Sequence, residues 1–216
     1  GVIVQTCKAK EILKKKYRKS SFFVIPNPIT NNSVVDSENR KNIILNVGSI
    51  GGNKNQSLLL EYFNAIEDKI KKDWIINFIG DGPLFNQLKE KTSNLQLNNK
   101  VVLLGLKRDI EKYYQNSSIF AFTSTSEGFP NALAEAMASG CACISFDCIA
   151  GPSDLIDDGI NGFLIPEGDH ETYREKLEVL ITNKDLRKKF SENAQEKMKK
   201  FESSKITKQF YNLLFQ

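Results

Sequence analysis

The sequence predicts an α/β fold, in which helices flank a Rossmann-like, doubly wound parallel sheet. Short apolar runs of strand length alternate along the chain with segments of helical periodicity. Turns rich in glycine, proline and polar residues separate these segments. Hydrophobic residues make up 40% and charged residues 26% of the chain, which is the balance of an ordinary globular protein. We therefore expect parallel strands joined by right-handed helical crossovers.

The expected elements follow one another along most of the chain. Strands are predicted at residues 22–25, 43–47, 74–79, 101–104, 119–122, 142–146 and 162–165. Helices are predicted at 56–70, 83–91, 109–115, 130–139 and 152–156, and two or three more complete the chain, the last at 203–215. Ligands of such sheets bind where the carboxyl ends of the strands meet. Five turns should gather there, at 48–55, 80–83, 105–108, 123–131 and 147–152.

The stretch E-G-F-P-N-A-L-A-E, from Glu127 to Glu135, is the most informative of these turns. Pro130 suits the first position of a helix, where its missing N–H costs nothing. The amides of Asn131 and Ala132 should then face outward, as an anion site requires. The stretch therefore predicts an anion site at the start of this helix.

The two carboxylates of this stretch allow several interpretations. Placed around an anion site, Glu127 and Glu135 could accept hydrogen bonds from sugar hydroxyls, and Gly128 would let a ligand approach the backbone. Glu127 could instead only stabilise the helix dipole, with Glu135 on a solvated face. The pair also resembles the two acids of glycoside hydrolases, whose separation the sequence does not give.

Several other functional classes lack their sequence signals. No apolar stretch is long enough to span a bilayer, and no signal peptide is visible. The dinucleotide pattern G-x-G-x-x-G is absent, and the single histidine, His170, fits an exposed helix start better than a catalytic triad. Cys141, Cys143 and Cys148 lack C-x-x-C spacing, so we expect no metal site. Cys141 and Cys143 should be buried, and free thiols indicate a cytoplasmic location.

Basic residues concentrate near the C-terminus, although the net charge is only +4. They are Arg187, Lys188, Lys189, Lys197, Lys199 and Lys200. With glutamates interleaved, this segment can be a solvated helix face. It could also attract an anionic lipid surface, which would place the protein peripherally at the inner face of the membrane. Nucleic acid is not an expected partner, because no basic stripe with interleaved aromatic residues is present.

Five motifs together resemble a family 4 (group 1) glycosyltransferase of the GT-B fold. In family order they are N-V-G-S-I-G-G-N-K-N-Q, F-I-G-D-G-P, V-V-L-L-G, T-S-T-S-E-G-F-P-N-A-L-A-E-A-M-A-S-G and G-P-S-D-L-I-D-D-G-I-N-G-F-L-I. The resemblance implies the C-terminal half of that fold. Its expected divisions are a remnant of the N-terminal acceptor domain (1–28), a linker (29–42), a donor-binding Rossmann-like domain (43–200) and a C-terminal crossover helix (201–216).

The resemblance also implies metal-independent transfer of a sugar, with retention, from a nucleotide-sugar. The E-G-F-P-N motif resembles enzymes of surface-polysaccharide assembly that use UDP-sugars, with a glycan or lipid-linked acceptor. No cofactor besides this donor is expected. By itself the fragment should be inactive in transfer, because the acceptor side lies in the N-terminal domain. Its apolar C-terminal stripe should then be exposed, and self-associate or be disordered.

Site roles follow from the same resemblance. Glu127 would bind the donor sugar, and Lys54 would neutralise the diphosphate; these two are the expected catalytic residues. Glu135 would accept hydrogen bonds from the ribose. Gly48, Ser49 and Gly51 would line the loop that binds the diphosphate, and backbone near Gly105 would meet the base. The sugar and its phosphate would be held by Gly128, Phe129, Pro130, Asn131 and Ala132.

One position departs from the family pattern, because Ser49 stands where the family usually carries arginine. Serine brings no charge, so diphosphate binding should be weaker, rest more on Lys54 or draw on another cation such as Arg108. An alternative to the enzyme is a non-catalytic nucleotide- or sugar-binding module on the same fold. Turnover of a donor would distinguish the two.

Overall fold

The computed structural model of the chain describes residues 1–30 and 39–215. Six parallel strands form its main sheet, in the order β5-β4-β3-β6-β7-β8. Their bounds are Lys41–Val47 (β3), Ile75–Ile79 (β4), Val101–Leu103 (β5), Ser117–Phe122 (β6), Ala142–Asp147 (β7) and Gly162–Pro166 (β8). The strand order reverses between β3 and β6, as in a doubly wound sheet. The predicted fold class is confirmed.

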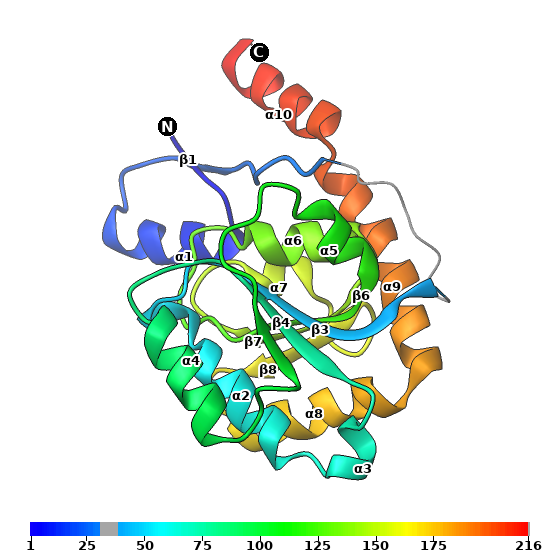
Figure 1. Cartoon of the computed structure of the whole chain (residues 1–216). Helices are drawn as coiled ribbons and strands as arrows, with labels where there is room; N and C mark the ends of the chain where they lie inside the picture. Colours follow the sequence, from blue (N-terminus) through cyan, green and yellow to red (C-terminus); the bar gives the residue numbers. More distant parts are fainter. Residues whose placement is uncertain (31–38, 216) are drawn as a thin grey trace.

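Helices cover both faces of this sheet (Figure 1). They are α2 (Gln56–Ala65), α3 (Asp68–Lys71), α4 (Phe85–Asn94), α5 (Glu111–Asn116), α6 (Asn131–Ala138), α7 (Pro152–Leu155), α8 (His170–Thr182) and α9 (Lys184–Met198). Short 3-10 helices occur at Gly52–Lys54 (η2) and Lys199–Phe201 (η3). Helix α10 (Ser203–Phe215) ends the described chain.

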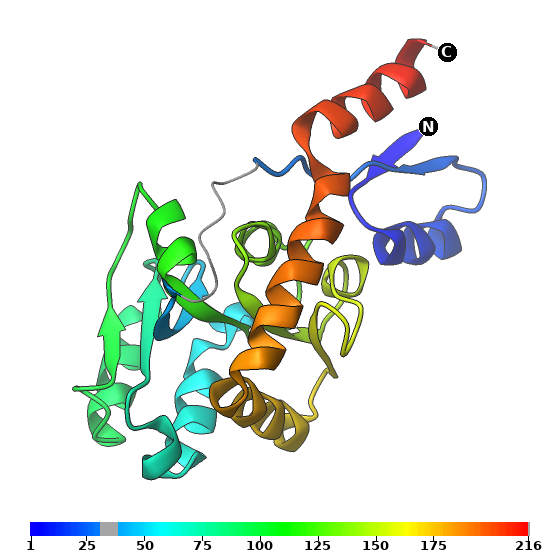
Figure 2. The same ribbon diagram turned by 90° about the vertical axis from the view of Figure 1, so that its right-hand side faces the viewer.

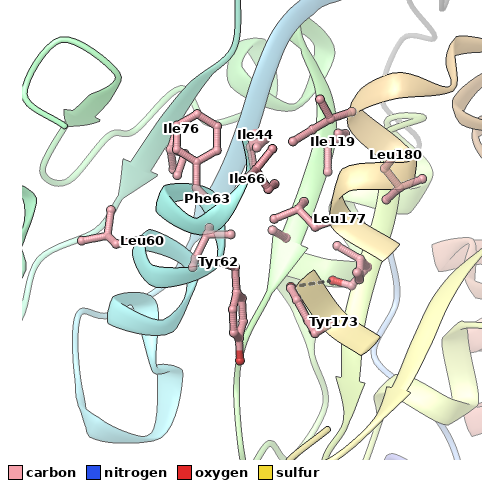
Figure 3. Close-up of a cluster of buried hydrophobic side chains, with 14 of the residues drawn as sticks. Ile44, Leu60, Tyr62, Phe63, Ile66, Ile76, Ile119, Tyr173, Leu177 and Leu180 are labelled. Atoms are coloured by element: carbon pink, nitrogen blue, oxygen red, sulfur yellow. Dashed lines mark hydrogen bonds between the residues drawn. The ribbon is translucent and has the colours of Figure 1, made fainter. Parts of the chain in front are cut away.

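Residues along each strand alternate between two apolar layers, because successive side chains of a strand point to opposite faces. Ile44 of β3 and Ile119 of β6 face the layer formed with α2 and α8, which Figure 3 shows with Phe63 and Leu177. Phe120 of β6 faces the opposite layer, formed with α5, α6 and α7. Burying each such side chain stabilises the fold by roughly 1.5–3 kcal/mol. This packing fixes the strand ends from which the site loops leave.

Several predicted boundaries differ from the structure. Strand β3 begins at Lys41, inside the predicted linker 29–42, while residues 31–38 of that linker lie outside the described chain. The single helix predicted at 56–70 is two, because Ile66 is extended and ends α2. Helix α4 begins at Phe85, two residues after the predicted start, because Gly82 and Pro83 take part in a turn.

The N-terminal segment contains two elements that the sequence did not predict, namely β1 (Val2–Val4) and α1 (Cys7–Lys16). Strand β1 pairs in parallel with β2 (Phe22–Val24) to form a separate two-stranded sheet. Thr6 caps α1 by accepting a hydrogen bond from the Ala9 amide. This unit lies beside the start of α6 and α7 in Figure 1.

Helix α10 projects away from the sheet towards the same side as the N-terminus (Figure 2). The helix is continuous, so the predicted disorder is wrong. Phe210, Tyr211, Leu214 and Phe215 are exposed, whereas Ile206 alone of its described residues is buried. The expected exposed stripe is therefore present, although Leu213 is half-buried, and self-association stays a prediction.

Candidate functional site

The loops after β3 and β6 meet at the point where the strand order reverses. The Thr125 amide donates to the Asn53 carbonyl at 2.9 Å. The Thr123 hydroxyl donates to the Lys54 carbonyl at 2.8 Å. These two bonds hold the loop at 48–55 against the loop at 123–131, so the predicted convergence of these two turns is observed.

Glycines allow the loops after β3 and β4 to approach each other closely. A Cβ atom at Gly80, where φ is +143°, would lie 1.9 Å from the Gly48 carbonyl oxygen. A Cβ at Gly82 would lie 2.4 Å from the Ile50 carbonyl oxygen. Only glycine fits at these two positions, and the tight packing fixes the path of the loop that carries Ser49.

The predicted loop glycines and Ser49 lie along one exposed turn. Gly48 and Gly51 are half-buried, and neither has a close neighbour at its Cβ position, so a ligand could approach both. Ser49 is exposed, and its carbonyl accepts a hydrogen bond from Gln56 Nε2 at 3.0 Å. The Ser49 backbone is therefore anchored while its side chain faces outward. The binding roles of these residues stay predictions.

Lys54 and Glu127 form an ion pair across the two loops. Lys54 ends η2, and its Nζ lies 2.5 Å from Glu127 Oε1. The exposed fractions of the two side chains are only 19% and 10%, so solvent screens this pair less than a surface pair. The Glu127 amide donates to the Ile149 carbonyl at 3.2 Å, which fixes the loop. An anion that reaches Lys54 would therefore also meet Glu127.

The start of α6 differs by one residue from the prediction. Pro130 is the N-cap, not the first helical residue, and its carbonyl accepts from the Ala134 amide at 3.0 Å. The amide of Asn131 donates to the Phe129 carbonyl at 2.9 Å, so it is not free as expected. Phe129 itself is buried against Phe201. The tight turn at 129–131 thus uses the Asn131 amide, which was expected to bind a ligand.

Other amides of the same turn remain available. Within residues 1–30 and 39–215, no hydrogen-bond acceptor contacts the amides of Gly128, Ala132 and Leu133. Gly128 is exposed and Ala132 half-buried, so both can be reached from solvent. The anion site expected at this helix start therefore keeps the amides of Gly128 and Ala132, whereas Leu133 is fully buried.

Glu135 lies in a different environment from Glu127. Its Oε2 accepts a hydrogen bond from the Tyr114 hydroxyl at 3.0 Å. Burial raises the pKa of the Glu135 carboxyl, and the Tyr114 bond partly opposes this by lowering it. The side chain is half-buried, so Glu135 does not lie on a solvated face. The two carboxylates have different partners, one a cation and the other a phenol.

A pocket of about 340 Å³ opens beside Glu135. Its wall includes Glu135, Tyr114, Asn131, Arg108 and Ile110. This volume suits part of a small-molecule ligand, with an acidic group and a basic group in the same wall. Neither Lys54 nor Glu127 lines it, so the structure places Arg108 with Glu135 and not with the diphosphate loop.

Gly105 lies at the carboxyl end of β5 with φ at +65°. Its carbonyl accepts a hydrogen bond from the Gly80 amide at 3.0 Å, which ties the loops after β4 and β5 together. A Cβ at Gly105 would meet no atom within 4 Å, so the position is open. Contact of this backbone with a base stays a prediction.

The N-terminal segment supplies residues that the sequence gave no reason to include. Gln5 Nε2 donates to Asn27 Oδ1 at 2.6 Å, and Asn27 Nδ2 donates to Asn131 Oδ1 at 2.8 Å. Tyr114 was also missed, because a tyrosine in a short helix gives no sign of where its hydroxyl points. These contacts depend on segments far apart in the sequence, which no local pattern reveals.

Some predicted features concern groups outside this site. Cys141 and Cys143 are free and buried, as expected, and Cys148 is also free and buried. In the described ranges, no cluster of three or more His, Cys, Asp or Glu side chains could hold a metal ion. His170 is exposed at the first residue of α8, as predicted, and its Nδ1 lies 2.6 Å from the Tyr62 hydroxyl. Over the described chain, none of the helices has the length and apolar character to cross a membrane.

Comparisons with known proteins identify relatives that are glycosyltransferases. An uncharacterized glycosyltransferase of Haemophilus influenzae is 27% identical over 216 residues, which are 99% of this chain and 60% of that protein. The N-acetylgalactosamine-N,N'-diacetylbacillosaminyl-diphospho-undecaprenol 4-alpha-N-acetylgalactosaminyltransferase of Campylobacter jejuni is 31% identical over 165 residues, or 76% of this chain and 44% of that enzyme. The chain thus spans less than two thirds of the length of these curated relatives.

Solved structures share the fold. A TarM mutant from S. aureus, in complex with Fondaparinux, alpha-GlcNAc-glycerol and UDP, superposes with a TM-score of 0.92 at 24% identity, over 100% of this chain and 44% of that one. The family described as glycosyl transferases group 1 matches residues 30–197, which include both loops and α6. The chain therefore belongs to the group 1 glycosyltransferase family, and its parallel sheet is the C-terminal half of a GT-B fold.

Proposed function

We propose that this chain binds the nucleotide-sugar donor of a glycosyltransferase, and that the whole protein transfers the sugar with retention. The observation that carries this proposal is the arrangement around α6. Lys54 pairs with Glu127 in the loop that leads into α6, and the amides of Gly128 and Ala132 at the start of this helix have no acceptor among the described residues. Glu135 of the same helix lines a pocket. A cation, open amides and a carboxylate are the groups that a diphosphate and a ribose require.

The chemistry follows from where charge develops. When the bond between sugar and diphosphate breaks, the leaving diphosphate gains negative charge. A fixed cation at Lys54 and the amides of Gly128 and Ala132 would stabilise that charge without a metal ion. Glu127, released from Lys54 by the phosphate, would accept hydrogen bonds from the sugar hydroxyls. Glu135 would do the same for the ribose.

We further propose a UDP-sugar as the donor and a glycan or lipid-linked acceptor, in surface polysaccharide biosynthesis. The family membership, the UDP in the TarM complex and the undecaprenol-linked substrate of the Campylobacter relative support this choice. The acceptor site would lie in the part of the protein that corresponds to the remaining length of the relatives. The basic residues of α9 and η3 support a cytoplasmic protein that contacts the inner face of the membrane peripherally.

A thermal-shift assay with UDP, GDP and ADP tests the donor site. Ligand at about 100 times its dissociation constant stabilises a protein by about 2.7 kcal/mol, so we expect UDP to raise the Tm by roughly 5–10 °C. Lys54→Ala and Glu135→Ala should abolish the shift. Lys89→Ala and Glu90→Ala, which change exposed residues of α4, are charge-matched controls and should keep it. No shift with any of the three nucleotides would reject the proposal.

A further inference from the structure

Glu135 depends on one side chain for its orientation. Within the described chain, Tyr114 is the only residue that donates a hydrogen bond to it. Tyr114 is 1% exposed and packs against Phe120, with ring centroids 5.9 Å apart. An apolar residue of similar shape could fill this space equally well. Among the described residues, the hydrogen bond that the hydroxyl makes is to the Glu135 carboxylate, so its contribution is polar and not one of packing.

The backbone of Tyr114 is fixed to the helix that carries Glu135. Arg40 Nη1 donates to the carbonyls of Tyr114 and Ser117, each at 2.8 Å. The other terminal nitrogen of the same guanidinium donates to the carbonyl of Ser139, the C-cap of α6. Arg40 thus joins the end of α5 to the end of α6. The distance between the Tyr114 ring and Glu135 is consequently set by two attachments, one at each end of the tyrosine.

The protonation states permit only one direction for this bond. Burial, followed by the nearby Glu135 charge, raises the pKa of Tyr114 well above its usual value, so the phenol keeps its proton and donates. Glu135 accepts through Oε2, and Oε1 has no protein donor among the described residues. The pocket beside Glu135 leaves room for a ligand to reach that carboxylate.

We propose that Tyr114 is a positioning residue for nucleotide recognition: its hydroxyl occupies one oxygen of Glu135 and presents the other, ionised, to the ribose hydroxyls of the donor. This inference rests on the proposed function and deepens it. Tyr114 acts through Glu135 by favouring both the rotamer and the charged form of the carboxylate that accept from a diol.

Other charged and titratable groups near Glu135 come from the loop before α5, from α5 itself and from the start of β7. The loop before α5 contributes Arg108 and Asp109, and α5 contributes Glu111. Behind Tyr114 lie Cys141 and Cys143, whose pKa values burial raises, so they stay neutral. Asp109 is paired with Lys112 at 2.5 Å. A change at the Tyr114 hydroxyl leaves all of these groups in place, so it isolates the bond to Glu135.

Tyr114→Phe tests the proposal by isothermal titration of the 216-residue chain with UDP between pH 5 and 8. At pH 8 we expect about tenfold weaker binding, the effect of losing one hydrogen bond to a charged group. Since the Tyr114 bond lowers the pKa of Glu135, its removal raises that pKa. Affinity falls as pH drops through the pKa of Glu135, so the acidic limb should move to higher pH in the variant. The terminal phosphate of UDP changes its protonation near pH 6, but this contribution is the same for the wild type and for every variant.

Two variants serve as matched controls in this titration. Tyr113→Phe removes the neighbouring hydroxyl on α5, which has no hydrogen-bond partner in the described ranges. This variant should bind UDP like the wild type. Glu135→Gln should bind weakly at every pH and lose the acidic limb that the carboxylate produces. Thermal unfolding of Tyr114→Phe establishes that the variant is folded.

A carbon-13 NMR titration of the Glu135 carboxyl in the ligand-free chain separates this inference from the proposed function. A higher pKa in Tyr114→Phe than in the wild type supports the inference without any nucleotide. An unchanged pKa would overturn it, as would equal weakening of UDP binding at every pH. Failure of the wild type to bind UDP would instead reject the proposed function.

Discussion

The two halves of the candidate site treat a carboxylate in opposite ways. On the loop side, Glu127 lies 2.5 Å from the Lys54 ammonium, so each charge has a partner. On the helix side, Glu135 accepts a hydrogen bond from a neutral phenol, and burial raises its pKa. The charge of Glu127 is therefore compensated in the folded protein, whereas ionisation of Glu135 costs free energy. Such a cost is typical of groups kept for binding.

Lys54→Ala should have the largest effect, because it removes the cation and leaves Glu127 uncompensated. We expect UDP affinity to fall by about 100-fold or more, the scale of losing one strong charge-stabilising group. Stability should also fall, by roughly 1–3 kcal/mol, since an unpaired, mostly buried charge remains. Calorimetry and urea unfolding measure the two effects. Lys54→Arg, which keeps the charge, should lose much less of both; equal losses in the two variants would contradict the account.

Gly151→Ala should disturb the helix start that both halves share. Gly151 has φ at +127°, and a Cβ there would lie 2.3 Å from Cδ of Pro130. Strain and overlap together should cost about 2–4 kcal/mol and weaken UDP binding, because the turn before α6 must move. Gly159→Ala is the matched control: φ is +69°, but no atom lies within 4 Å of the added Cβ. Its cost should be about 1 kcal/mol, with UDP binding unchanged.

Ser49→Arg should strengthen the loop side alone. The side chain at this position is exposed and its backbone is anchored by Gln56, so an arginine can extend towards a diphosphate. We expect UDP to bind about 3- to 10-fold more tightly, as one added charge-assisted contact suggests. Uridine, which lacks phosphate, should bind as it does to the wild type. A gain for uridine as well would mean that the arginine acts elsewhere.

Glu135→Gln should have the smallest effect on stability, and an opposite sign to Lys54→Ala. A carboxyl whose pKa is raised in the folded state favours folding when protonated, and this contribution is lost as pH rises through that pKa. Glutamine removes the resulting cost at neutral pH, so the Tm should rise by roughly 1–4 °C at pH 7.5. The gain should vanish as the pH falls below the pKa of Glu135. A lower Tm at pH 7.5 would contradict the contrast between the halves.

The sequence predicted the parts of the molecule that depend on local pattern. Strands such as β6 and the helix α10 follow from apolar periodicity, and the loop positions of Lys54 and Glu127 follow from turn signals and family motifs. What it could not predict depends on contacts between distant segments. The turn that uses the Asn131 amide, and the hydroxyl that Tyr114 directs to Glu135, are set by tertiary packing. The start of β3 at Lys41 was missed because its first residues are exposed and polar.

A crystal structure of the chain soaked with UDP is the decisive test of the proposed donor site. We expect diphosphate oxygens within hydrogen-bond distance of Lys54 Nζ and of the amides at the start of α6. We also expect the ribose hydroxyls on Glu135, with the Tyr114 bond retained. UDP bound away from α6, or with its ribose turned from Glu135, would show that the donor site lies elsewhere.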